Sequence, residues 1–227
     1  MHRYAVARKV IDWQVIAFLC SAGMELIQNT ADLSAYLAAD EAIDHHHPVV
    51  RETAARLAAG AADSYAYARA AFDFVRDTIP HSQDSGDPRV TWRASDVLAL
   101  GTGICYAKSH ALAALLRAED IPTALCYQRL AHDDGGHAVH GLVAVRFHGA
   151  WHRQDPRGNK PGADARFSLD GEYLAWIPDP AAGEVDYPLL YAAPHPVVLD
   201  ALKAAPDRPY LWKTLPDALD HEWPAGV

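Results

Sequence analysis

The feature that most constrains the fold is a run of helix-forming residues that starts directly after the glycine-rich segment Gly101–Cys105. Thr102 is placed to cap this helix and Gly103 to be its first residue. A proline cannot continue a helix, so we expect the helix to end near Asp120, before Pro122. One apolar face is predicted from residues at helical spacing, namely Ile104, Ala107, Ala111, Leu112, Leu115 and Leu116. Cys105 would then lie in the first turn of the helix.

A β-hairpin is predicted downstream of this helix. Residues 140–148 are rich in β-branched and aromatic side chains, as strands are. The His-Gly pair at 148–149 favours a tight turn into a returning strand over residues 150–155. In such a hairpin His140 and Asp155 fall at the same end, on neighbouring strands. A carboxylate could therefore lie close enough to an imidazole to fix its orientation.

A thiol, an imidazole and a carboxylate are the parts of a cysteine nucleophile. A free thiol has a pKa of about 8.5, so it needs a helix N-terminus, a nearby imidazole and a group that orients the imidazole. Each residue also has an ordinary structural explanation, as a buried thiol, a strand histidine or a turn-forming Asp before Pro. The ordered combination favours catalysis, with Cys105 as nucleophile, His140 as base and Asp155 as its partner.

An oxyanion formed by such a nucleophile would need hydrogen-bond donors. The backbone N–H of Cys105 is one candidate. The side chains of His81, Gln83 and Gln128 are candidates for a second donor, although each could be an exposed loop or strand residue. We favour Gln83, because its loop directly precedes the nucleophile region.

Thirteen histidines raise the alternative of a metal site. His45, His46 and His47 are consecutive, so their side chains cannot all converge on one ion in a regular element. A denser set lies within residues 132–152, but without a cysteine pair or a His-Glu-x-x-His spacing. Two adjacent acids at 133–134 would make a poor calcium cage. We therefore predict no metal and no cofactor, and keep a metal-binding hydrolase as an alternative.

Composition limits the classes of partner. A chain of 227 residues that is 50% hydrophobic can bury a full core without the support of disulfides or metal ions. The net charge of -9 argues against nucleic acid or an anionic membrane as the main partner. Three cysteines imply no disulfide framework, no signal peptide pattern opens the chain, and the apolar stretch 15–20 is too short to span a bilayer. We expect a cytoplasmic protein acting on a peptide, a protein or a small amide.

The chain is divided by prolines and polar stretches into an N-terminal extension (1–43), a main domain (44–200) and a C-terminal tail (201–227) packed on that domain. Further helices are predicted at 31–39, 49–59, 64–77, 96–100 (capped by Ser95) and 196–204, further strands at 125–130 and 167–176, and a polar loop at 80–88.

Seven parts of the sequence form a recognisable set: 94–98, 101–105, 113–118, 121–122, 140–142, Trp151 and 155–160. Together they resemble the core of the transglutaminase-like superfamily, including its bacterial cysteine peptidases. The resemblance implies an α+β, papain-like/transglutaminase-core fold, with the nucleophile helix packed on an antiparallel β-sheet and additional N-terminal helices. It also implies Cys105 as nucleophile, His140 as general base and acid, and Asp155 as the residue that orients His140.

The resemblance leaves the acceptor of the acyl group open. A thioester on Cys105 could be released by water or captured by an amine, because acceptor choice depends on water access and cleft shape. We favour a transglutaminase-like hydrolase or peptidase acting on amide bonds, the glutamine side chain included, over a transamidase. A non-catalytic protein-binding domain that keeps the fold is the other alternative.

Overall fold

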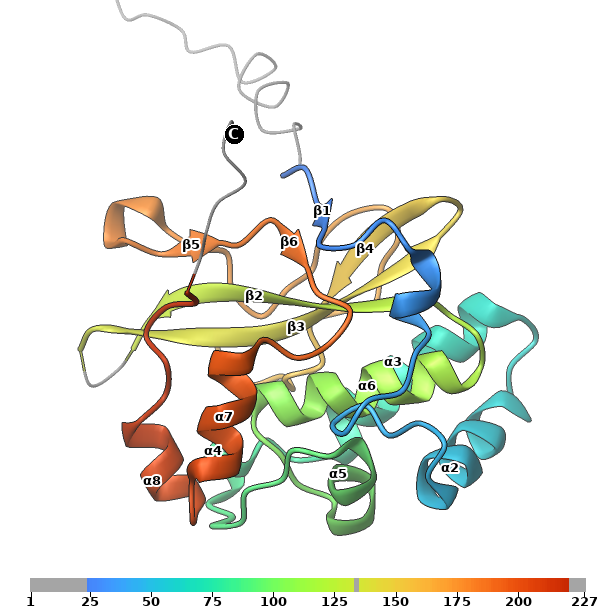
Figure 1. Cartoon of the computed structure of the whole chain (residues 1–227), viewed down its shortest axis with the longest axis horizontal. Coiled ribbons are helices and arrows are strands. Elements are labelled where there is room, and N and C mark those ends of the chain that lie inside the picture. The colour runs from blue at the N-terminus through green and yellow to red at the C-terminus, as the bar shows by residue number, and fades with distance from the viewer. Residues whose placement is uncertain (1–23, 133–134, 221–227) are drawn as a thin grey trace, which may run out of the picture.

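A curved antiparallel sheet lies over a layer of helices (Figure 1). The computed structural model describes residues 24–132 and 135–220. The sheet has the strand order β4-β3-β2-β5, and each neighbouring pair is antiparallel. Its strands are β2 (Thr123–Ala131), β3 (His137–Phe147), β4 (Ala150–Gln154) and β5 (Val185–Asp186). This arrangement confirms the predicted α+β class.

The hairpin of β3 and β4 turns where the sequence predicts it. His148 and Gly149 both have positive φ, 51° and 84°, as a two-residue turn between twisted strands requires. The first strand is longer than predicted, because β3 already pairs with β2 from His137 onward. Gln154 is the last residue of β4, so Asp155 follows directly at the end of the hairpin nearer His140.

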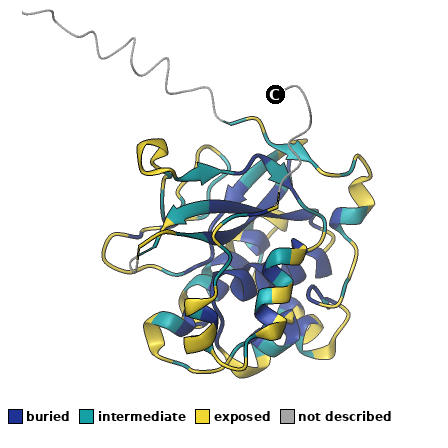
Figure 2. Cartoon of the chain, turned by 60° about the vertical axis from the view of Figure 1, so that its left-hand side comes forward, coloured by how far each residue is buried: buried dark blue, intermediate teal, exposed yellow. Residues whose placement is uncertain are grey.

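Helix α6 (Cys105–Ala118) fills the centre of the molecule (Figure 2). It packs against β2 and β3 on one side. On the other side it contacts α2 (Pro48–Ala58), α3 (Ser64–Thr78) and α5 (Ala94–Leu100). We predicted a single apolar face, but every residue of α6 is buried, because layers cover the helix on both sides. The buried residues include four polar ones, Lys108, Ser109, His110 and Arg117.

Arg117 holds three distant segments together. Its Nε and Nη2 donate to the carbonyl of Thr123 at 3.1 and 2.6 Å, at the start of β2. Nη1 donates to Ala38 O at 2.6 Å, and Nη2 also donates to Ala192 O at 2.7 Å. Because a buried cation is tolerated only when its donors are paired, these carbonyls are what permit an arginine here.

Lys108 is fully buried at the end of α3. Its ammonium donates to the carbonyls of Arg76 and Ile79, at 3.2 and 2.5 Å. These are among the last carbonyls of the helix, which lack partners within it and attract a cation. Burial is the main cause that lowers the pKa of Lys108 to about 7, and the nearby Arg157 adds to it.

Helix α6 and strand β3 approach very closely at Gly141. A Cβ on Gly141 would lie 2.8 Å from Cδ1 of Tyr106 and 3.3 Å from its Cα. Two hydrogen bonds cross the same contact: Tyr106 donates its hydroxyl to Val139 O at 2.5 Å, and Ser109 donates to Gly141 O at 3.1 Å. Glycine is therefore the residue that lets the strand lie this close to the helix.

The helices before α6 follow the predicted order with two corrections. α2 starts at Pro48, one residue before the predicted range, and α3 follows it. Ser95 does not cap α5: the N-cap is Arg93, and Ser95 instead donates its hydroxyl to Asp44, which holds the preceding loop. The predicted polar loop at 80–88 contains a short helix, α4 (Ser82–Ser85).

The predicted strand at 167–176 is absent from the described structure. The side chain of Gln154 bonds both backbone groups of Ser168, at 2.6 and 3.2 Å, so this segment is held by a side chain rather than by a ladder. The next strand along the chain is β5, which follows a short 3-10 helix, η2 (Pro180–Ala182), and pairs with β2.

The segments before and after the main sheet meet each other. β1 (Ile27–Gln28) pairs in parallel with β6 (Leu189–Leu190), as Figure 1 shows. The helix predicted at 31–39 is reduced to a 3-10 turn, η1 (Leu33–Tyr36). Helix α7 (Pro196–Ala204) has its predicted bounds, and α8 (Arg208–Lys213) follows it.

The N-terminal extension is described only from residue 24, and the apolar stretch 15–20 lies outside the described residues. Within residues 24–132 and 135–220, the helices are all too short or too polar to cross a membrane. The division of the chain at 43 and 200 stays a prediction.

Candidate active site

A cleft of about 530 Å³ opens where the N-terminus of α6 meets β3. Cys105 and His140 both border it. Its other walls come from α4, from the segment after β4, from residues 176–177 and from α8. The side chains used below that line it are Cys105, His140, His81, Gln83, Asp84, Arg157, Lys160, Trp176 and Trp212.

Cys105 is the first residue of α6, and the cap of the helix differs from the prediction. The N-cap is Ile104, without a side-chain cap bond, so Thr102 does not cap the helix and Gly103 does not belong to it. Residues before Cys105 are instead extended, because Gly103 pairs in parallel with His81 and its carbonyl accepts from Ser82 N at 3.0 Å. The thiol thus lies at the open end of the helix, 6% exposed, on the cleft wall.

His140 lies on β3, opposite Gln128 of β2. Its Nε2 is 2.9 Å from Oδ2 of Asp155, and both side chains are buried. The edge of the imidazole meets Trp176 at a centroid distance of 5.0 Å and an angle of 89°. The hairpin therefore brings the predicted imidazole and carboxylate into direct contact, and Trp176 covers the ring.

Asp155 is fixed by backbone donors as well as by His140. Its Oδ1 accepts from Arg157 N at 3.0 Å and its Oδ2 from Ala175 N at 3.1 Å. Burial alone would raise the pKa of Asp155, but His140 and these two N–H groups lower it below its ordinary value. The carboxylate is thus held ionised in the interior, aimed at the imidazole.

The charge of His140 responds to both partners. Burial on its own would lower the pKa of His140, but Asp155 and the neighbouring Cys105 raise it to about 10. An imidazole between a carboxylate and a thiol in this way is the arrangement that activates a cysteine nucleophile.

Gln83, the favoured second oxyanion donor, lies on α4 and borders the cleft. Its Oε1 accepts from Arg208 Nη1 at 2.5 Å, which ties α4 to α8. Gln128 is fully buried and donates to Asp186 of the neighbouring strand β5 at 2.9 Å. His81 is also buried, and its ring borders the cleft beside Cys105.

Sequence reasoning did not assign a role to Arg157 or Trp176. Arg157 pairs in a bidentate way with Asp84, at 2.5 and 2.9 Å, and lies over the ring of Trp176 at 5.2 Å. Lys160 is 3.6 Å from the same carboxylate. Arg157 lies in the segment 155–160 that carries part of the family resemblance, so that segment could have drawn attention to it. No local sequence pattern marks Trp176. This cluster forms one rim of the cleft.

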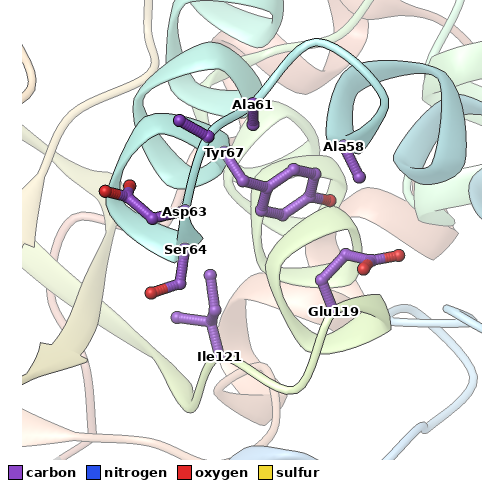
Figure 3. A pocket seen from close by; sticks show the side chains of 8 residues that line it. Ala58, Ala61, Asp63, Ser64, Tyr67, Glu119 and Ile121 are labelled. Atoms are coloured by element: carbon purple, nitrogen blue, oxygen red, sulfur yellow. The ribbon is translucent and has the colours of Figure 1, made fainter.

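A second hollow of about 260 Å³ lies between α2, α3 and the end of α6 (Figure 3). Ala58, Ala61 and Ile121 line it together with Glu119 and Tyr67, whose hydroxyl donates to Leu115 O. None of the predicted site residues borders it. It therefore offers no alternative location for the predicted chemistry.

The histidine-rich segment does not form a ligand set where the structure describes it. Within 24–132 and 135–220 there is no group of three His, Cys, Asp or Glu side chains arranged to hold a metal ion. The pair at 133–134 lies outside the described residues.

Comparison with known proteins points in the same direction. Residues 51–156, a little under half of the chain, match the profile of the transglutaminase-like superfamily, and this segment contains Cys105, His140 and Asp155. No curated protein matches the chain.

Two solved structures are similar at low identity. One is a candidate cysteine protease from Cytophaga hutchinsonii, at 18% identity and a TM-score of 0.47, over 59% of this chain and 46% of that chain. The other is the periplasmic domain of TgpA from Pseudomonas aeruginosa, at 21% identity and a TM-score of 0.42, over 56% and 48%. This chain thus spans less than half of the length of these structures.

Proposed function

We propose that this chain, whose residues 51–156 match the profile of the transglutaminase-like superfamily, is a cysteine-dependent hydrolase of amide or peptide bonds. Cys105 is the nucleophile, His140 the general acid and base, and Asp155 the residue that orients His140. One observation carries the proposal: a buried His140–Asp155 pair at 2.9 Å borders the same cleft as a thiol at a helix N-terminus.

The proposed reaction begins with attack of the Cys105 sulfur on the carbonyl carbon of the substrate. The C=O electron pair moves to oxygen, and the resulting oxyanion collapses as the C–N bond breaks. Imidazolium His140 gives its proton to the leaving nitrogen, which departs as an amine or as ammonia. Neutral His140 then takes a proton from water, whose oxygen attacks the thioester and releases the acid and the thiolate.

Hydrolysis is proposed over transamidation because of the cleft itself. The cleft of about 530 Å³ that Cys105 borders has room for water, and hydrolysis needs no second binding site for an amine. Substrates of the proposed enzyme are peptides, proteins or small amides, including the side-chain amide of glutamine.

A reducing compartment, and therefore the cytoplasm, is the proposed location. Cys105 and Cys126 are both free thiols in the structure. Oxidation of Cys105 to a disulfide would abolish the proposed chemistry, and reducing compartments prevent it.

Labelling with iodoacetamide tests the nucleophile. The wild-type protein, Cys105→Ala, His140→Ala and the control Cys126→Ala are labelled at neutral pH, and the modified cysteine is identified by mass spectrometry. We expect fast labelling of Cys105 in wild type and Cys126→Ala, slower labelling in His140→Ala, and loss of the fast phase in Cys105→Ala. A fast phase that survives in Cys105→Ala, or a Cys105 that reacts no faster than Cys20, contradicts the proposal and favours a non-catalytic binding domain.

The acceptor is tested separately with glutamine-containing peptides, with and without an added primary amine. Hydrolysis predicts release of ammonia and formation of glutamate, or backbone cleavage, at rates independent of the amine. Incorporation of the amine in place of water would show a transamidase.

A further inference from the structure

His81 is a buried imidazole at the active-site cleft that the proposed mechanism does not yet use. It is 5% exposed and lies in the turn before α4. The parallel pairing of His81 with Gly103, two residues before Cys105, fixes its backbone beside the N-terminus of α6. Its side chain borders the cleft together with Cys105 and His140. Chain segments far apart in sequence therefore place two imidazoles and one thiol around the same cleft.

The hydrogen bonds of His81 are incomplete. Nδ1 is buried and has no hydrogen-bond partner among the described residues. An unpaired polar atom in the interior costs stability and in native proteins calls for an explanation in function or in a missing partner. A lone pair without a donor is the less costly state for Nδ1, because orphaned N–H groups are rarer in protein interiors than orphaned acceptors. The proton of a neutral ring then belongs on Nε2.

The surroundings keep this ring neutral. Burial is the main cause that lowers the pKa of His81 well below its ordinary value, and the positive charges of Arg157 and Lys108 add to it. His140 and Lys160 act in the same sense. A neutral imidazole with its proton on Nε2 is a hydrogen-bond donor that does not compete with His140 for protons.

The two other side chains considered as donors are placed differently. Gln128 does not border the cleft, and it donates its amide N–H to Asp186 of the neighbouring strand β5. Gln83 borders the cleft, and Arg208 binds its carboxamide oxygen, so the amide N–H groups of Gln83 are a competing donor. His81 borders the cleft and has a buried ring nitrogen without a hydrogen-bond partner among the described residues.

We propose that His81 is a catalytic residue that donates its Nε2–H to the oxyanion formed when Cys105 attacks a carbonyl. The second donor is the backbone N–H of Cys105, which has no carbonyl partner within α6 because it is in the first turn. When the sulfur–carbon bond forms, the C=O electron pair becomes a negative charge on oxygen between these two N–H groups. It returns to re-form the carbonyl as the C–N bond breaks. This assignment rests on the proposed function of Cys105.

Two reactions of the same thiol separate His81 from the nucleophile. Alkylation by iodoacetamide displaces iodide and forms no oxyanion, so it reports only on Cys105 and His140. Acylation by p-nitrophenyl acetate passes through a tetrahedral oxyanion and releases p-nitrophenolate, which is measured by absorbance. A Cys20→Ser background limits reaction at other sites, and Cys105→Ala gives the residual rate of each reaction.

The variants are chosen so that one atom group changes at a time. His81→Phe keeps a flat ring without a donor, and His81→Gln restores an N–H. Gln83→Leu tests the competing donor. His152→Phe, on β4 and outside the cleft, is the matched control for a histidine-to-phenylalanine change.

We expect His81→Phe to lower the acylation rate constant by about 100- to 1,000-fold, as loss of one oxyanion donor does. The alkylation rate should stay within about twofold of wild type, which also shows that the variant is folded. His81→Gln should recover part of the acylation rate, and His152→Phe should match wild type.

Other outcomes overturn the assignment. Equal losses of acylation and alkylation in His81→Phe would mean that His81 supports the fold or the thiol rather than the oxyanion. A loss of acylation in Gln83→Leu with none in His81→Phe would transfer the role to Gln83. If alkylation is already insensitive to Cys105→Ala, the proposed function itself fails, and that result is distinct from the others.

Discussion

Replacing Gly141 by alanine should separate the thiol from the imidazole. The added Cβ would lie 2.8 Å from Cδ1 of Tyr106 and 3.3 Å from its Cα. Tyr106 is buried, and its hydroxyl is bound to Val139 O at 2.5 Å, so the ring cannot swing away by itself. Because Tyr106 follows Cys105 and Gly141 follows His140, the strain falls directly on the contact between the two functional side chains.

The size of the effect follows from the distances. Two carbon atoms are in contact at about 3.5 to 4.0 Å, so the helix and strand must separate by about 1 Å at this point. Overpacking of this kind costs about 1 to 3 kcal/mol of unfolding free energy. A displacement of about 1 Å between reacting groups lowers a rate by about 100-fold.

Urea unfolding and acylation by p-nitrophenyl acetate measure the two consequences in one variant. Gly60→Ala is the matched control, because its added Cβ would meet only Leu57 O, at 3.9 Å. We expect Gly141→Ala to lose both stability and acylation rate while Gly60→Ala loses neither. A Gly141→Ala protein with wild-type values for both would show that the α6–β3 contact does not position the site.

Three further perturbations probe the buried charges. Arg117→Met should lower the unfolding free energy by about 3 kcal/mol, since three carbonyls each lose a donor at about 1 kcal/mol. The exposed Arg69→Met should cost under about 1 kcal/mol in the same urea titration. Equal losses in the two variants would contradict the role of Arg117 in holding the three segments together. The pKa of His140 is raised to about 10, so its stabilising contribution is complete below about pH 6.5 and is lost as pH rises toward 10. The unfolding free energy of wild type should therefore fall relative to that of His140→Gln over this range. A difference between the two proteins that does not change with pH would refute the pairing with Asp155. The pKa of Lys108 is instead lowered to about 7, so the cost of burying its charge is relieved as pH rises from 7 toward about 10.5. The unfolding free energy of wild type should therefore rise relative to that of Lys108→Met over this range. If the difference between the two proteins does not change with pH, Lys108 keeps its ordinary pKa in the folded protein.

Local patterns predicted the parts of the site that depend on local geometry. The His148-Gly149 pair predicts a tight turn, and both residues have the positive φ that such a turn needs. This turn brings Asp155 to His140. The periodic apolar residues after Cys105 predict the helix itself, but it begins at Cys105 rather than at Gly103. The catalytic roles of Cys105, His140 and Asp155 stay predictions.

Contacts between distant segments could not be read from the sequence. Thr102 looks like a helix cap, but the pairing of Gly103 with His81 keeps the chain extended until Ile104. Lys108 is buried because the C-terminal end of α3 lies against α6. The periodicity of the α6 sequence does not predict this contact. The same holds for Trp176, which reaches His140 from a segment without regular structure.

The order of these groups along the chain has a consequence for protein synthesis. On a ribosome, Cys105 emerges well before His140 and Asp155, and Trp176 emerges later still. A thiol without its imidazole reacts as an ordinary, mostly protonated cysteine. In the enzyme that we propose, Cys105 would therefore become reactive only after the β3–β4 hairpin and Trp176 have been synthesised and have folded around His140.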